Sequence, residues 1–200
     1  MSAIKKSDHW ISPEDYLEGE KLAAVRHEYL GGVVHAMAGA SKIHNKIGSN
    51  INIWLRAALR GKPCESFIEG VKVRLAGKET VFYYPDVFVA CDPRDTDEFY
   101  SDYPAVIFEV LSADTRRFDR LEKRWAYQTI ETLQTYILVD QHKIEVSVWQ
   151  RGGEKEPPIV LTTLEESVAL PGLGLNLPLA EIYADIQLTP EKRRFYDDMP

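Results

Sequence analysis

Residues 104–111 read Pro-Ala-Val-Ile-Phe-Glu-Val-Leu, and this stretch decides the fold because it is apolar on both faces of an extended chain. Alternate side chains of a β-strand point to opposite sides, so Ile107, Glu109 and Leu111 share one face while the other face is wholly apolar. A strand with two apolar faces is typical of the centre of a covered sheet. The stretch therefore predicts a buried central strand that carries one carboxylate, Glu109.

The segments around this strand predict a mixed α/β domain with a central β-sheet flanked by helices. Helices are expected after the cap residues Ser12-Pro13, where Asp15 stands in the capping-box position, and along an apolar stripe at Ser41–Leu59. Further helices are expected at Thr115–Ile130 and Leu179–Ala184. The strands expected besides residues 104–111 are Val25–Leu30, Val33–Met37, Cys64–Ile68, Val71–Leu75, Val81–Ala90, Leu133–Val139 and Ile144–Trp149.

Two adjacent segments, Cys64–Ile68 and Val71–Leu75, are expected to pair with each other as neighbouring strands. The adjacent glycines Gly31-Gly32 favour a tight turn between the first two strands, because glycine adopts positive φ angles. We expect one domain over residues 1–188, followed by a charged tail at residues 189–200.

Composition bounds the class of protein. The 200 residues carry 24 Lys and Arg against 31 Asp and Glu, a formal charge of −7, which is not the sign of a protein that coats nucleic acid non-specifically. The two cysteines, Cys64 and Cys91, fit neither a disulfide framework nor a zinc pattern. No secretory signal or membrane-spanning run is recognisable, so we expect a soluble, reduced, cytoplasmic protein that does not associate with membranes.

Three carboxylates lie in segments that are otherwise mostly apolar or predicted to be strands. Burying an isolated charge at Glu109 would cost roughly several kcal/mol of folding free energy unless the carboxylate were paired, hydrogen-bonded or metal-bound. The alternative interpretation is that Glu109 lies near a strand end and turns its side chain toward water. Asp86 follows Pro85, which cannot donate to a ladder and indicates a bulge or an edge, although Pro-Asp is also a common turn pair. Glu28 lies in the first hairpin arm, where a solvated strand face is the alternative.

The predicted helix after the Glu109 strand is basic. Residues 116–124 contain five basic and two acidic side chains, a local charge of +3, and Lys123 and Tyr127 share one face. A solvated helix with internal ion pairs is the alternative, but a turn from strand to helix delivers these residues close to the carboxyl end of the strand. Two acids and a lysine at one place suit phosphodiester hydrolysis, in which the carboxylates hold Mg²⁺ and the lysine stabilises charge on the phosphate.

The chain also resembles a known family, the Uma-type restriction endonucleases of the PD-(D/E)XK nuclease superfamily. The resemblance covers about Ser12 to Leu188 and rests on several long matches in one order, which are SPEDYL, RHEYLGGVVHAMAGAS, FYYPDVFVACDPRD, VIFEVLSADTRRFDRLEKRWAYQ and TLQTYILVDQ. It implies a restriction-endonuclease-like fold, with a mixed central β-sheet flanked by helices. It further implies a metal-dependent endonuclease that hydrolyses DNA phosphodiester bonds with Mg²⁺ or Mn²⁺.

The resemblance assigns roles residue by residue. Asp86 and Glu109 match the two metal-binding acids, Lys123 the catalytic lysine and Glu28 an early acid, so these four are the expected catalytic residues. His44 and Tyr127 match recurrent residues of possible accessory role. The usual superfamily lysine, two residues after the second acid, is Leu111 here, and a second hairpin Glu is Val33. The arginines expected to contact DNA phosphates are Arg116, Arg117, Arg120 and Arg124.

Three classes of function stay open at this point. The first is a Mg²⁺-dependent DNA endonuclease, which we expect to act as a homodimer because cutting two strands favours two sites. The second is a nuclease-like fold that binds nucleic acid or a protein without cutting it, and Leu111 and Val33 motivate this alternative. A glycosidase that uses Glu109 and Asp86 as an acid/base pair is a third, disfavoured because no sugar cleft is recognisable.

Overall fold

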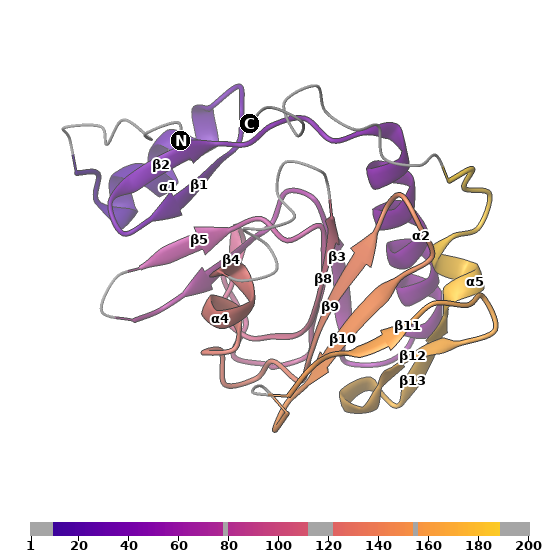
Figure 1. Cartoon of the computed structure of the whole chain (residues 1–200). Helices are drawn as coiled ribbons and strands as arrows, with labels where there is room; N and C mark the ends of the chain where they lie inside the picture. The colour runs from indigo at the N-terminus through magenta and orange to yellow at the C-terminus, as the bar shows by residue number, and fades with distance from the viewer. Residues whose placement is uncertain (1–9, 78–79, 112–121, 154–155, 189–200) are drawn as a thin grey trace.

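The computed structural model describes residues 10–77, 80–111, 122–153 and 156–188, and their helices and strands are drawn in Figure 1. In chain order the helical elements are α1 (Pro13–Leu22), α2 (Lys42–Ala58), α4 (Arg124–Tyr127), the 3₁₀ turn η2 (Pro171–Leu173) and α5 (Leu179–Ile182). The strands are β1 (His27–Leu30), β2 (Val33–Ala36), β3 (Glu65–Ile68), β4 (Lys72–Leu75), β5 (Val81–Tyr83), β6 (Val87–Ala90), β7 (Tyr100–Ser101), β8 (Pro104–Leu111), β9 (Thr135–Asp140), β10 (Val146–Gln150), β11 (Ile159–Leu161), β12 (Ser167–Leu170) and β13 (Leu175–Pro178).

The N-terminal elements form as the sequence predicts. The Ser12 hydroxyl accepts a hydrogen bond from the Asp15 backbone N–H at 3.0 Å and caps α1. Strands β1 and β2 form an antiparallel hairpin, and Gly31 and Gly32 adopt φ angles of 55° and 100° in its turn. A Cβ atom at Gly32 would meet the Trp10 side chain at 2.1 Å, so this position needs glycine for space as well as for its φ angle.

The described strands form two large sheets and a separate pair, β12-β13. A five-stranded sheet has the order β2-β1-β5-β4-β7, and a six-stranded sheet has the order β11-β10-β9-β8-β6-β3. The six-stranded sheet is mixed, since β8 pairs parallel to β9 and antiparallel to β6. The mixed central sheet of the prediction is therefore confirmed, and β8 lies inside it as expected.

Two predictions about neighbouring strands are wrong. Strands β3 and β4 do not pair; β3 joins β6 in the six-stranded sheet and β4 joins β5 in the other. The single strand predicted over residues 81–90 is two strands, because the chain leaves one sheet after Tyr83 and enters the other at Val87. Pro85 lies in this crossing, where a residue without a backbone N–H breaks no ladder.

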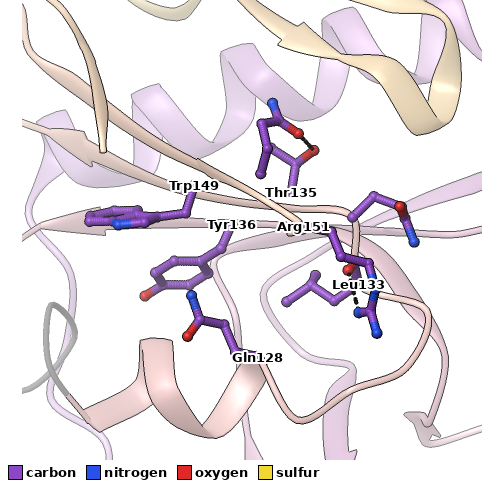
Figure 2. Close-up of a pocket in the computed structure, with 8 residues that line it drawn as sticks. Gln128, Leu133, Thr135, Tyr136, Trp149 and Arg151 are labelled. Carbon is purple, nitrogen blue, oxygen red and sulfur yellow. Dashed lines mark hydrogen bonds between the residues drawn. The ribbon is translucent and has the colours of Figure 1, made fainter. Parts of the chain in front are cut away.

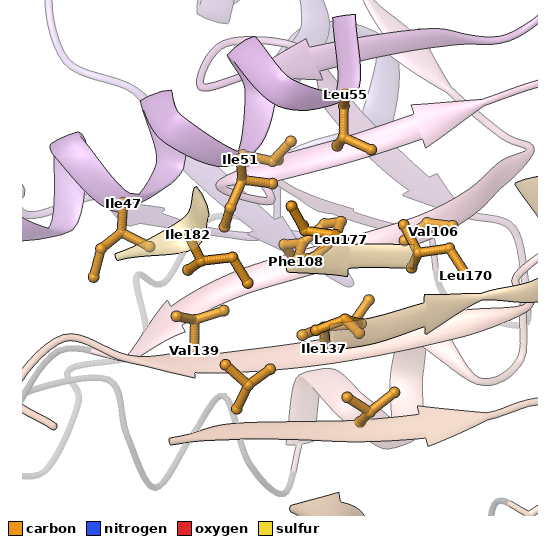
Figure 3. Close-up of a cluster of buried hydrophobic side chains, with 14 of the residues drawn as sticks. Ile47, Ile51, Leu55, Val106, Phe108, Ile137, Val139, Leu170, Leu177 and Ile182 are labelled. Atoms are coloured by element: carbon orange, nitrogen blue, oxygen red, sulfur yellow. The ribbon is translucent and has the colours of Figure 1, made fainter. Parts of the chain in front are cut away.

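The two faces of β8 enter different apolar clusters, which is why the strand is apolar on both sides. Val106, Phe108 and Val110 pack into a cluster with Ile47, Ile51 and Leu55 of α2. Figure 3 shows these α2 side chains above Phe108 and Val106, together with Leu170, Leu177 and Ile182 from the C-terminal segments. Ile107 and Leu111 pack into the second cluster, which includes Val73 and Tyr83 of the five-stranded sheet. The second cluster therefore lies between the two sheets.

Cys64 and Cys91 form a disulfide, so the expectation of two unpaired thiols is wrong. The register of β3 against β6 pairs Glu65 with Ala90, which brings the residues on either side, Cys64 and Cys91, to a Cα–Cα distance of 4.1 Å. The bond joins the start of β3 to the end of β6. The disulfide could not be predicted from the sequence separation of 27 residues alone, because it depends on the register of the two strands.

Candidate active site

Glu109 is a buried carboxylate in the middle of the protein. It lies on the face of β8 that meets the second apolar cluster, between Ile107 and Leu111, and only 3% of its surface is exposed. The alternative of a strand end that turns to water is therefore wrong. A charged group at this depth needs partners, because burying it unpaired would cost roughly several kcal/mol of folding free energy.

Lys123 supplies one of these partners. Its side chain is 7% exposed as a residue, and its Nζ lies 3.5 Å from Oε1 of Glu109 and 2.9 Å from Oε1 of Glu28. Lys123 directly precedes α4, so the helix places the ammonium group beside the strand that carries Glu109. One cation thus contacts two carboxylates from two different sheets, since Glu28 belongs to β1 and Glu109 to β8.

Glu28 is not on a solvated strand face. Its side chain is 13% exposed and it pairs in register with His35 across the hairpin. The ring of Tyr83, in the neighbouring strand β5, lies beneath the Lys123 ammonium at 5.3 Å from Nζ to the ring centroid. Burial, together with the nearby charge of Glu28, raises the pKa of Tyr83 to about 12. Tyr83 therefore stays neutral and offers an aromatic face to the cation.

Tyr127 completes the contacts of Glu109 that the helix provides. Its hydroxyl donates a hydrogen bond to Oε1 of Glu109 at 3.1 Å, and its side chain is fully buried. Burial raises the pKa of Tyr127 well above its usual value, and the charge of Glu109 adds to the effect. The phenol therefore remains a donor, and Lys123 and Tyr127 both hold the same carboxylate oxygen, one helical turn apart.

Asp86 lies next to β8, directly before the neighbouring strand β6. Val87 pairs with Phe108 in the antiparallel β6–β8 ladder, so Asp86 stands opposite Glu109 when the register is continued by one residue. Its Oδ2 accepts a hydrogen bond from the backbone N–H of Val110 at 2.6 Å. Its Oδ1 lies 2.8 Å from Nε2 of His44 on α2. Both carboxylate oxygens of Asp86 are thereby held, one by the β8 backbone and the other by α2.

The predicted arginines are mostly outside the described residues. Arg116, Arg117 and Arg120 fall in residues 112–121, and the predicted helix Thr115–Ile130 is seen as α4 in its second half. Arg124 is described, and its guanidinium lies over Trp125 and Trp149 at 4.5 and 4.9 Å. Its phosphate-binding role stays a prediction.

The described residues offer few ligands for a divalent ion. Within the residues that the structure describes, no three His, Cys, Asp or Glu side chains are close enough together to hold a metal. Mg²⁺ needs fewer, because it is commonly held by one or two carboxylates plus water and substrate phosphates. The backbone positions of Asp86 and Glu109 are opposite each other when the β6–β8 register is continued by one residue, so this pair is the candidate for such ligands. Glu28 does not join them as a third ligand here, because Lys123 stands between it and Glu109.

Sequence reasoning missed Tyr83 and His35. Tyr83 lies beneath the lysine, and its signal would have been its position three residues before Asp86 in the same predicted strand. His35 pairs with Glu28 only through the hairpin register, so the Gly31-Gly32 turn could have identified it.

A small hollow beside the aromatic side chains is not the substrate site. Figure 2 shows it between Tyr136, Trp149, Gln128 and the segment that carries Leu133 and Arg151. Its volume is about 10 Å³, which is room for one water molecule. The Arg151 guanidinium fills its rim by donating to the Leu133 carbonyl at 3.1 Å.

Comparison with known proteins gives a consistent result. The family model described as "Uma2: Putative restriction endonuclease" matches residues 13–180. Two curated relatives, the uncharacterized proteins slr1290 and sll1609 of Synechocystis sp. strain PCC 6803, are 31% and 32% identical over 175 and 149 residues. These alignments cover 86% and 73% of this chain and 91% and 84% of the relatives.

A solved structure shares the fold. The crystal structure described as "a putative nuclease belonging to DUF820 from Anabaena variabilis" superposes with a TM-score of 0.70 at 17% identity, covering 87% of this chain and 98% of that one. The restriction-endonuclease-like fold expected from the sequence is thereby confirmed. No helix in the described part of the chain is long and apolar enough to span a bilayer.

Proposed function

We propose, from the premise that this chain belongs to the Uma2 restriction-endonuclease family, that it is a metal-dependent endonuclease that hydrolyses phosphodiester bonds in DNA. The observation that carries the proposal is the position of Lys123, whose ammonium contacts the buried Glu109 and Glu28. Asp86 precedes the strand next to the one that carries Glu109. Acidic ligands for a metal and one cation for the phosphate are the groups that this hydrolysis requires, which supports the proposal.

Asp86 and Glu109 would hold Mg²⁺ or Mn²⁺, and the ion would supply a water of lowered pKa and neutralise charge on the phosphate. The protein's own groups set the geometry. His44 and the Val110 N–H orient Asp86, while Tyr127 and Lys123 orient Glu109. Glu28 holds the Lys123 ammonium beside the strand, where it would stabilise the charge that develops on the scissile phosphate.

The missing superfamily lysine is explained by the same arrangement. Leu111 is on the face of β8 that carries Glu109, and it is buried in the apolar cluster between the sheets. A lysine there would point to this same face, because side chains two residues apart along a strand share a side. Lys123 reaches the face from α4 instead, so we propose that it takes the catalytic role that Leu111 does not fill.

A second candidate is a binding module that does not cut. It is favoured by the neutralisation of Glu109, whose Oε1 already has Lys123 and Tyr127 as partners. In that case the cluster is a structural ion-pair network and no divalent ion binds. Calorimetric titration with Mg²⁺ or Mn²⁺ separates the two candidates, since only the nuclease requires binding that Asp86→Asn weakens.

Cleavage of supercoiled plasmid tests the proposal directly. With Mg²⁺ or Mn²⁺, Asp86→Asn and Glu109→Gln should each lower the nicking rate by about 100-fold or more, because each removes one charged ligand without changing side-chain shape. Glu18→Gln, at an exposed ion pair with Lys21, is the matched control and should nick at the wild-type rate. Equal nicking by all four proteins would mean that a contaminant cuts the plasmid and would overturn the proposal.

Two further expectations belong to this proposal. We expect a homodimer, and light scattering would then give twice the chain mass of 22.8 kDa. The cytoplasmic location expected from the sequence stays a prediction. Disulfides are rare in reducing compartments, so the redox state of Cys64 and Cys91 in cells would check it.

A further inference from the structure

The charge of the chain is unevenly distributed, and α2 lies in its basic part. No Asp or Glu occurs from Tyr29 to Cys64, whereas this stretch contains five basic residues, which are Lys42, Lys46, Arg56, Arg60 and Lys62. The stretch therefore carries +5 in a chain of net charge −7, and the remaining residues carry −12. An acidic protein that must bind a polyanion needs such a local region of positive charge.

The basic residues at the C-terminal end of α2 line an open groove. Its volume is about 650 Å³, and it lies between α2 and strand β3, which is the edge strand of the six-stranded sheet. Arg56, Arg60 and Lys62 are exposed along it, with Glu65 as the acidic residue of its lining. Ile53 and Phe67 add apolar side chains to the lining of the groove. Arg56 and Arg60 are four residues apart and share a face of the helix.

Both walls of the groove lead to the candidate active site. At the other end of α2, His44 contacts Asp86 at 2.8 Å. At the other end of β3, the Glu69 backbone N–H donates to the Asp86 carbonyl at 3.2 Å. In Figure 1, α2 runs beside the six-stranded sheet along this whole distance. A ligand lying along α2 would therefore reach Asp86 at one end and Arg56 at the other.

The spacing fits a nucleic-acid backbone. His44 and Arg56 are separated by 12 residues, or about 18 Å along a helix that rises 1.5 Å per residue. Duplex DNA advances about 3.4 Å per base pair, so roughly five base pairs cover the distance. Regularly spaced phosphates would meet the arginines while one phosphate lies at the catalytic cluster.

We propose that the groove between α2 and β3, lined by Arg56, Arg60 and Lys62, binds the phosphate backbone of the DNA substrate about five base pairs from the scissile phosphate. This inference rests on the proposed function, because it takes DNA as the substrate. It adds a second contact region, which is separate in the sequence from the predicted arginines at residues 116–124. The contact is to phosphate, so it adds affinity and register without reading base sequence.

Fluorescence anisotropy with a 30-base-pair duplex tests the groove. In a Glu109→Gln background, which prevents cutting, Arg56→Gln and Arg60→Gln should each weaken binding about fivefold to tenfold at 0.1 M salt. Each should also reduce the slope of log affinity against log salt by about 1, since one phosphate contact is lost. Lys21→Gln removes the same charge from α1 and is the matched control, expected to bind within twofold of the background. Thermal melts followed by circular dichroism check that all variants fold.

The outcomes distinguish the groove from the proposed function. If the background protein binds DNA and both arginine variants bind it equally well with an unchanged salt slope, the groove inference is wrong and the nuclease proposal is untouched. If the wild type neither binds nor nicks DNA, both fail together. Displacement of the duplex by polyglutamate at equal charge concentration would show an acidic peptide site and would also overturn the groove inference.

Discussion

At the scale of single residues, Lys123 shows how one buried cation ties distant segments together. It contacts Glu28 of β1 and Glu109 of β8, which are 81 positions apart in the chain. Removing the partner of a buried charge usually costs more than the ion pair contributes, because an uncompensated charge is left in a poorly hydrated place. Disrupting the cluster should therefore lower the stability of the folded protein, in addition to affecting its proposed catalytic role.

We expect Lys123→Met to lower the free energy of unfolding by about 3 kcal/mol, because it leaves Glu28 and Glu109 without their shared cation. Urea unfolding followed by circular dichroism measures this. Lys143→Met breaks the exposed pair with Glu145 and should cost below about 1 kcal/mol. Adding Glu28→Gln to Lys123→Met should recover part of the loss, since one of the two unpaired charges is then gone. A Lys123→Met protein as stable as the wild type would refute the reasoning.

At the scale of elements, the disulfide fixes two strands whose pairing the local sequence does not specify. Strands β3 and β6 form one edge of the six-stranded sheet, and the Cys64–Cys91 bond closes the chain across their ends. A cross-link of this kind stabilises the folded protein chiefly by restricting the unfolded chain, in the loop-entropy description.

We expect Cys64→Ser/Cys91→Ser to lower the free energy of unfolding by about 3 kcal/mol, as expected for a loop of this length. The midpoint of urea denaturation, measured with and without a reducing agent, checks it. The reductant should shift the wild type and leave the double variant unchanged. A wild-type midpoint that ignores the reductant would contradict the prediction.

The elements also show which structural features are readable from local sequence. Ser12, the Gly31-Gly32 turn and the two apolar faces of residues 104–111 were predicted correctly, because each signal lies within a few residues of its effect. The strand that pairs with β3 was not predicted correctly, because the sequence of a four-residue strand does not specify which strand lies next to it. For the site, the choice of Lys123 over Leu111 came from family resemblance, and the contact with Tyr83 and the pairing of Glu28 with His35 depend on the three-dimensional register.

At the scale of the whole molecule, buried tyrosines set a limit on alkaline stability. In the described part of the chain, burial raises the pKa of several tyrosines above the usual value near 10, among them Tyr16, Tyr29, Tyr83, Tyr84, Tyr100, Tyr127 and Tyr183. Above pH 10 the unfolded chain releases these protons while the folded protein keeps them. The folded state then binds more protons, so the free energy of unfolding falls as the pH rises.

We expect this stabilisation to be intact below pH 10 and to decline from there through the pKa of Tyr83, which is about 12. Each tyrosine contributes up to about 1.4 kcal/mol per pH unit in that window. Tyrosinate absorbance near 295 nm, recorded together with circular dichroism, measures it: a large part of the signal should appear in the same transition as unfolding. Complete tyrosinate formation in a still-folded protein would contradict the prediction.

The crossing of the chain between its two sheets, at residues 84–86, also bears on when the proposed nuclease would become active. The residues proposed to be catalytic come from β1, the crossing, β8 and the start of α4, so they span residues 28 to 123 and both sheets. A nascent or clipped fragment that ends before Lys123 lacks part of this set. Under the nuclease proposal, cutting therefore requires both sheets to be folded and docked, and an incomplete chain would not cut.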